Sequence, residues 1–108
     1  MALIAFVDER TKSKYQKLKD GQPAEVLVNT LITRAIDKLR ENPFCGIQIK
    51  KEMIPKKYKK YHINNLWKFN LNDKWRLTYS VTSDENVLVI IIIEWFDHKA
   101  YNKLFGYG

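Results

Sequence analysis

Three side chains in the C-terminal half, Arg76, His98 and Tyr101, are of types that can act on a phosphodiester. RNA is cleaved without a metal when its 2′-hydroxyl attacks the neighbouring phosphorus. That reaction requires a base, an acid and fixed positive charge near the phosphoryl oxygens. A histidine titrates close to neutral pH, and the planar guanidinium of an arginine matches the oxygens of a phosphate. Tyr101 follows His98 by one helical turn, so the two share a face on which the phenol can donate a proton or stack on a base.

These residues also have structural interpretations, which the sequence leaves open. A histidine just past a strand end often only forms hydrogen bonds at a helix terminus, and an arginine on an exposed strand face is usually solvated. Tyr101 can equally be a core residue that anchors a last helix. Glu94 is expected to form an ion pair with Lys68 or Arg76 across the sheet, and a role as the base is the alternative.

A lysine-rich stretch supplies most of the net charge. The sequence "KKEMIPKKYKKY" (50–61), called the basic segment below, contains six lysines and one glutamate and so carries most of the total charge of +7. This excess favours a polyanionic partner, either a nucleic acid or an acidic protein, although a solvated loop has the same composition. Its interleaved aromatic rings can stack on bases. The candidate RNA-binding residues are Lys50, Lys51, Lys56, Lys57, Lys59, Lys60 and Lys68, together with Tyr58 and Tyr61.

Common motifs of cofactor and metal sites do not occur in the sequence. It contains no GxxxxGK[ST] or GxGxxG loop, no cysteine pair for zinc and no HExxH, so neither a cofactor nor a metal is expected. Cys45, the single cysteine, is expected to be a small buried or half-buried residue. The apolar run "VLVIIII" (87–93) is too short to cross a membrane as a helix, and no basic lead of a signal peptide precedes the first apolar run. We therefore expect a cytoplasmic protein without a membrane partner.

The hydrophobic pattern predicts a single domain, residues 1–108, of the α+β class. In chain order we expect a strand over 2–7, a helix that Asp8 caps and that ends near 19, a helix over 23–41, an irregular stretch over 47–65, strands over 66–70, 75–81 and 87–95, and a short helix within 97–106. This order, β-α-α-β-β-β-α, favours a mostly antiparallel, twisted sheet with the two N-terminal helices packed on one face.

Alternation within the strands gives the expected sheet two different faces. Trp75, Leu77 and Tyr79 in "KWRLTYSV" fall on one face and are expected to pack on the helices. The other face is expected to present a polar and basic surface formed by Lys68, Arg76, Thr78 and Ser80. The run 87–95 is apolar on both faces and is therefore expected at the centre of the sheet.

Two stretches, "NNLWKFNLNDKWRLTYSV" and "VLVIIIIEWFDHKAYNKL", resemble the RelE/ParE superfamily of toxins from type II toxin–antitoxin systems. In those toxins a strand with the pattern (Y/W)R(L/V)xY precedes an apolar strand, which a histidine or arginine and then a tyrosine follow. The ending "EWFDHKAY" is similar to the HigB-like branch. The expected element order is also that of the family.

This resemblance implies a metal-independent endoribonuclease that cleaves mRNA at the ribosomal A site and leaves a 2′,3′-cyclic phosphate. It also implies a cognate antitoxin that covers the active face. By the resemblance Arg76 binds the scissile phosphate, His98 is catalytic and Tyr101 matches the C-terminal tyrosine. The family's active-site lysines fall in the region of Lys50, Lys51, Lys56 and Lys57. Two other functions stay open. One is ParE-like inhibition of DNA gyrase, although the basic residues argue against it. The other is RNA binding without catalysis.

Overall fold

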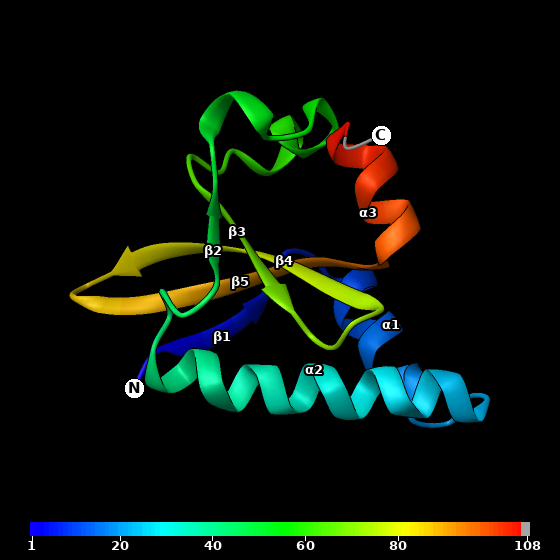
Figure 1. Cartoon of the computed structure of the whole chain (residues 1–108). Helices are drawn as coiled ribbons and strands as arrows, with labels where there is room; N and C mark the ends of the chain where they lie inside the picture. The colour runs from blue at the N-terminus through cyan, green and yellow to red at the C-terminus, as the bar shows by residue number, and fades with distance from the viewer. Residues whose placement is uncertain (107–108) are drawn as a thin grey trace.

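A mixed five-stranded sheet with three α-helices makes up the computed structural model, which describes residues 1–106 (Figure 1). The elements are β1 (Leu3–Phe6), α1 (Glu9–Leu18), α2 (Pro23–Glu41), β2 (Ile47–Ile49), the 3-10 helices η1 (Lys51–Met53) and η2 (Lys56–Tyr61), β3 (Leu66–Asn70), β4 (Trp75–Asp84), β5 (Val87–Asp97) and α3 (His98–Phe105). The strands lie in the order β1-β5-β4-β3-β2, with β1 parallel to β5 and the other neighbours antiparallel. The predicted α+β class is confirmed.

The stretch 47–65 is more ordered than we predicted. It contains the edge strand β2, which pairs with β3, and its lysines lie on the two short 3-10 helices or beside them. The three-residue β2 and the lysine-rich 3-10 helices carry no hydrophobic period that could be recognised in the sequence. We predicted that the run 87–95 lies at the centre of the sheet, and this was wrong by one position in the strand order. The central strand is β4, and β5, which contains the run, lies between β4 and β1.

Local sequence fixes where the two N-terminal helices begin. The Asp8 carboxylate accepts a hydrogen bond of 2.8 Å from the backbone N–H of Thr11, and so caps α1 as predicted. Pro23 opens α2, where a missing backbone N–H costs nothing. The Glu25 carboxylate then accepts from the backbone N–H of Gln22 at 3.0 Å. These caps hold the start of α2 against the sheet.

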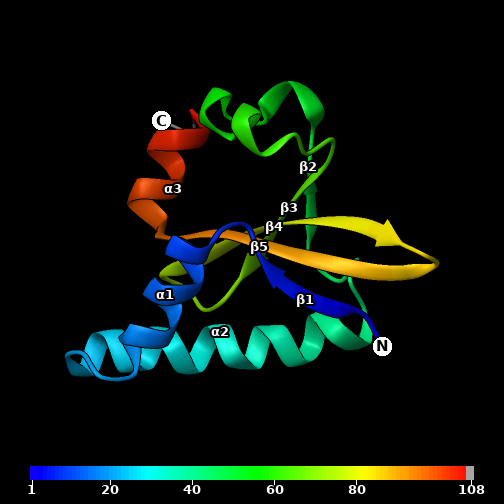
Figure 2. The same cartoon turned by 180° about the vertical axis from the view of Figure 1, so that it is seen from behind.

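The first core lies between α2 and one face of the sheet (Figures 1 and 2). The inward residues of α2 recur every three or four positions, and they meet the alternating inward residues of β4 and β5. The buried members are Ala2, Val28, Ile32, Ala35, Ile36, Leu39, Leu77, Tyr79, Val81, Ile90 and Ile92, with Trp67, Phe69, Trp75 and Trp95 packed against them. The predicted packing of Trp75, Leu77 and Tyr79 on the helices is confirmed.

A second core covers part of the opposite face, beneath α3 and the basic segment. Its buried members are Ile49, Tyr58, Leu66, Ile93, Phe96, Tyr101 and Phe105. Thr78 and Ser80 are buried there, so the prediction that they lie on an open polar surface was wrong. The physical reason is that the folded basic segment and its flanks satisfy their hydroxyls. The Ser80 hydroxyl, for example, donates to the carbonyl of Asn65 at 2.8 Å.

One extra residue in β5 reverses its alternation. The register passes from Tyr79–Ile92 to Thr78–Glu94, which leaves Ile93 without a partner across the ladder. This is a β-bulge, which places two residues opposite one. Even-numbered side chains of β5 face the first core before the bulge, and odd-numbered ones face it afterwards. Glu94 thereby comes to the same face as Thr78.

The connection from α2 to β2 is tied to β4 by a buried phenol. The Tyr79 hydroxyl donates to the carbonyl of Pro43 at 2.9 Å and accepts from the backbone N–H of Gly46 at 3.1 Å. Burial raises the pKa of Tyr79 to about 12. Gly46 passes so close that an added Cβ would lie 2.6 Å from both the Tyr79 hydroxyl and the carbonyl oxygen of Lys68. Glycine is therefore required by this contact.

Candidate functional site

Residues from three strands form a polar row across the second face of the sheet. Lys68 of β3 is in register with Thr78 of β4, which is in register with Glu94 of β5. Arg76 lies two residues before Thr78 on the same face of β4. The sheet thus brings together residues 68, 76, 78 and 94, as the alternation predicts for the first three.

Lys68 and Arg76 form a pair of neighbouring cations. Burial, and then the positive charge of Arg76, lowers the pKa of the Lys68 ammonium. The Lys68 Nζ lies 5.2 Å from the ring centroid of Tyr101, a cation–π distance. Two cations at such a site stabilise an anion that is placed between them.

Arg76 is held by the turn that joins β3 to β4. Its Nη1 donates to the carbonyls of Asn72, Asp73 and Trp75 at 2.9, 3.3 and 3.2 Å. Within residues 1–106 its Nε and Nη2 have no hydrogen-bond partner. The side chain is half-buried. The guanidinium is therefore fixed in orientation and still has N–H groups to offer to a phosphate.

His98 is exposed and is the first residue of α3. It follows Asp97, which pairs with Trp75 in the ladder, so it lies at the same end of the sheet as Arg76. The Asp97 carboxylate accepts from the backbone N–H of Ala100 at 2.8 Å and caps α3. An exposed imidazole at this end is accessible to a ligand.

Tyr101 belongs to the second core. Only 3% of the residue is exposed, and its ring centroid lies 4.4 Å from that of Phe105 and 6.3 Å from that of Phe96. This placement supports the core interpretation and leaves no room for a base to stack on the ring. Tyr101 can still act on the site through Lys68, whose ammonium lies over its ring.

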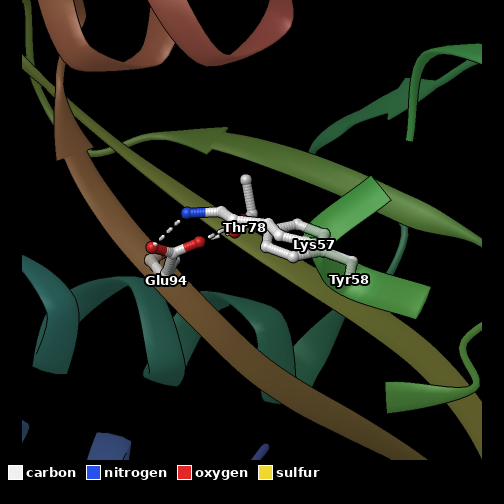
Figure 3. Close-up of polar contacts among 4 residues, drawn as sticks. All are labelled: Lys57, Tyr58, Thr78 and Glu94. Carbon is white, nitrogen blue, oxygen red and sulfur yellow. Dashed lines mark hydrogen bonds and ion pairs between the residues drawn. The ribbon is translucent and has the colours of Figure 1, made fainter. Parts of the chain in front are cut away.

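A four-residue network attaches the basic segment to the sheet (Figure 3). The Tyr58 hydroxyl donates to the Glu94 carboxylate at 2.7 Å and lies 3.1 Å from the Thr78 hydroxyl. The Lys57 ammonium donates to the other Glu94 oxygen at 2.9 Å. Glu94 therefore pairs with Lys57, and the prediction that it pairs with Lys68 or Arg76 was wrong.

The prediction that Tyr58 stacks on a base was also wrong. It is 1% exposed, and burial raises its pKa above the ordinary range of a phenol. Tyr61 is half-exposed, with the Lys60 Nζ 5.2 Å from its ring centroid. The other lysines of the segment are exposed and available to a polyanion, namely Lys50, Lys51, Lys56, Lys59 and Lys60.

The fold adds two cations that the sequence did not single out. Arg10 and Lys14 of α1 line a cleft together with Lys57 and Lys60 of η2. These residues are more than 40 positions apart in the chain, so only the tertiary structure shows that they meet. Cys45, in contrast, is exposed, and the prediction that it is buried or half-buried was wrong. Within residues 1–106 no helix has the length and apolar character needed to cross a membrane.

The arrangement of sheet and helices is that of a RelE-like toxin fold. The particular structure to which the chain is similar is the YoeB/ParE toxin from Agrobacterium tumefaciens. The likeness has a TM-score of 0.59 and covers 89% of this chain and 98% of that one, at 15% sequence identity. No family model and no curated protein matches the chain. The resemblance to RelE/ParE toxins is thus confirmed at the level of the fold.

Proposed function

We propose that this chain is the toxin of a type II toxin–antitoxin system and that it cleaves mRNA without a metal. The observation that carries the proposal is the pair of cations, Lys68 and Arg76, at the end of the sheet where α3 presents His98. Such a site fits a phosphodiester, since fixed cations stabilise the negative charge that builds on the phosphoryl oxygens. The fold supports the proposal because a RelE/ParE-like toxin shares it.

In the proposed reaction the 2′-hydroxyl of the RNA loses its proton to a base and attacks the adjacent phosphorus. The bond from phosphorus to the 5′-oxygen breaks, and an acid protonates that oxygen, which leaves a 2′,3′-cyclic phosphate and a 5′-hydroxyl. His98 serves in one of these two proton transfers. Arg76 and Lys68 hold the phosphoryl oxygens, and Tyr101 positions Lys68. The exposed lysines of the basic segment bind the RNA backbone.

The test is cleavage of mRNA by purified protein, in a translation extract and with free RNA. We expect Arg76→Ala to lower the cleavage rate by about 10²–10³-fold, the usual loss when one group that stabilises a transition state is removed. Because Arg76 also binds the β3–β4 turn, circular dichroism must show that the variant is folded. Arg34→Ala on the exposed surface of α2 is the matched control. A folded wild-type protein that cleaves no mRNA, with or without ribosomes, would contradict the proposal.

The burial of Tyr101 favours a second candidate, a basic RNA-binding module without catalysis, because it removes one possible proton donor from the reacting surface. That candidate predicts salt-sensitive RNA binding that persists in His98→Ala, with no cyclic-phosphate product.

The proposed toxin also requires a cognate antitoxin and cytoplasmic targets, namely mRNA and the ribosome. Co-expression of the neighbouring open reading frame is expected to relieve the growth arrest that the chain causes alone.

A further inference from the structure

A cleft lies between the first turns of α1 and η2, at the β5 end of the polar row. Figure 2 shows the start of α1 beside β5, with the basic segment above the same strand. The side chains that line the cleft include Glu94 and one aliphatic residue, Ile93, both from β5. The charged and aromatic side chains that line it include Arg10, Lys14, Lys57, Lys60, Tyr61 and Asp8.

The cations of this cleft are poorly neutralised. Within residues 1–106 the Lys57–Glu94 contact is the one ion pair, so Arg10, Lys14 and Lys60 have no carboxylate within 4.0 Å. The second carboxylate of the cleft, Asp8, accepts a hydrogen bond from Thr11, and this bond together with the charges of Lys60 and Arg10 lowers its pKa. It therefore offsets part of the positive charge, and the four cations of the cleft still outnumber its two carboxylates. Folding thus brings like charges from distant segments together, which costs free energy unless an anion binds between them.

The lining points to a nucleic acid and not to an acidic protein. A groove for an amphipathic helix offers a continuous apolar surface to the partner, whereas the side chains that line this cleft are mostly polar. The half-exposed ring of Tyr61 lies at its side with Lys60 over it, which suits the stacking of a base beside a phosphate. Glu94, which lines the cleft, is in register with Thr78 and, through it, with Lys68, so the cleft lies at the β5 end of that row.

We propose that the cleft formed by Arg10, Lys14 and Lys60 binds backbone phosphates of single-stranded RNA, next to the cleavage site. This inference rests on the proposed function for the class of its ligand, and it assigns to α1 a part of the RNA path. A long RNA contacts both the cleft and the Lys68–Arg76 site, while a very short one reaches only one of them.

The test compares two triple variants with equal loss of charge. The cleft variant is Arg10→Gln, Lys14→Gln and Lys60→Gln, and the control is Lys19→Gln, Arg34→Gln and Lys38→Gln, which are exposed and lie outside the cleft. The probe is a 2′-O-methyl RNA of about 12 nucleotides, a length in the range that such surfaces bind. Since this RNA lacks the attacking hydroxyl, binding is measured without cleavage. Affinity is measured over a range of salt concentrations.

We expect the cleft variant to bind about ten-fold or more weakly at low salt than the control. Its slope of log affinity against log salt should fall by about 2, at roughly 0.7 for each lost phosphate contact. At low salt it should also unfold at a higher temperature than the wild type, since the repulsion is relieved. Equal affinities and slopes in the two variants would overturn the inference and leave an acidic protein as the ligand. A wild-type protein that binds through the cleft but never cleaves mRNA would support the inference and contradict the proposed nuclease.

Discussion

At the scale of single residues, Arg76 has two uses that compete for the same guanidinium. One nitrogen donates to three carbonyls in and beside the β3–β4 turn, and within residues 1–106 the remaining N–H groups have no hydrogen-bond partner. A loss of activity in Arg76→Ala therefore has a structural and a chemical component. The neighbouring Lys68 offers a way to separate them, because its pKa reports directly on the charge of Arg76.

Arg76→Gln is expected to raise the pKa of the Lys68 ammonium. Burial and the charge of Arg76 both lower that pKa in the native protein, and the substitution removes the second cause. The measurement is a pH titration of the Lys68 side chain by NMR, with Arg34→Gln as the control. An unchanged Lys68 pKa in a folded Arg76→Gln protein would show that the two cations do not act on one anion.

At the scale of elements, two segments approach closely at Gly46, where β3 and the Tyr79 phenol leave no space for a side chain. We expect Gly46→Ala to lower the free energy of unfolding by about 1–3 kcal/mol, the usual cost of overpacking. Urea denaturation measures this loss.

Gly21→Ala is the matched control for this substitution. Its added Cβ would meet the exposed side chain of Glu25, whose displacement costs no more than the cap hydrogen bond to the backbone of Gln22. The interpretation of Gly46 as a close contact would be wrong if both alanine variants had the same stability.

The α-helices and the strands with a clear apolar pattern could be predicted from the sequence, whereas β2 and the two 3-10 helices could not. The α2 helix has five inward residues at helical spacing, and its bounds agree with the prediction. The strand Leu66–Asn70 also agrees. By contrast, β2 has three residues, and nothing in a run of four isoleucines indicates which of them forms the bulge. The part of the site that depends on alternation along β3 and β4 could be predicted. The fold of η2 over Thr78 could not.

At the scale of the whole molecule, the stability should fall steeply at alkaline pH. The pKa of Tyr79 is raised to about 12 by burial, while a phenol in the unfolded chain titrates near ~10. The neutral form is favoured by folding, so this stability is fully present below pH ~10 and is lost as the pH rises toward 12. Tyr58, whose pKa is also raised by burial, acts in the same direction.

In this pH range Tyr79→Phe should reduce the slope of unfolding free energy against pH by up to ~1.4 kcal/mol per pH unit, the value for one proton. Urea denaturation at a series of alkaline pH values gives the slope for each protein. Identical slopes in the wild type and in Tyr79→Phe would mean that this phenol is not protected by the fold.

The β-bulge makes the length of the isoleucine run more important than its composition. Exchange of one isoleucine for valine in 90–93 would keep each later residue on its present face. Deletion of one would remove the bulge and restore a regular alternation, in which Glu94 and Trp95 keep their present faces. Insertion of one more residue after the bulge would instead turn Glu94 toward α2 and Trp95 toward the basic segment. Because α3 begins directly after β5, the insertion would also turn its apolar side away from the second core. Insertions in this strand should therefore be excluded during evolution, even where substitutions are tolerated.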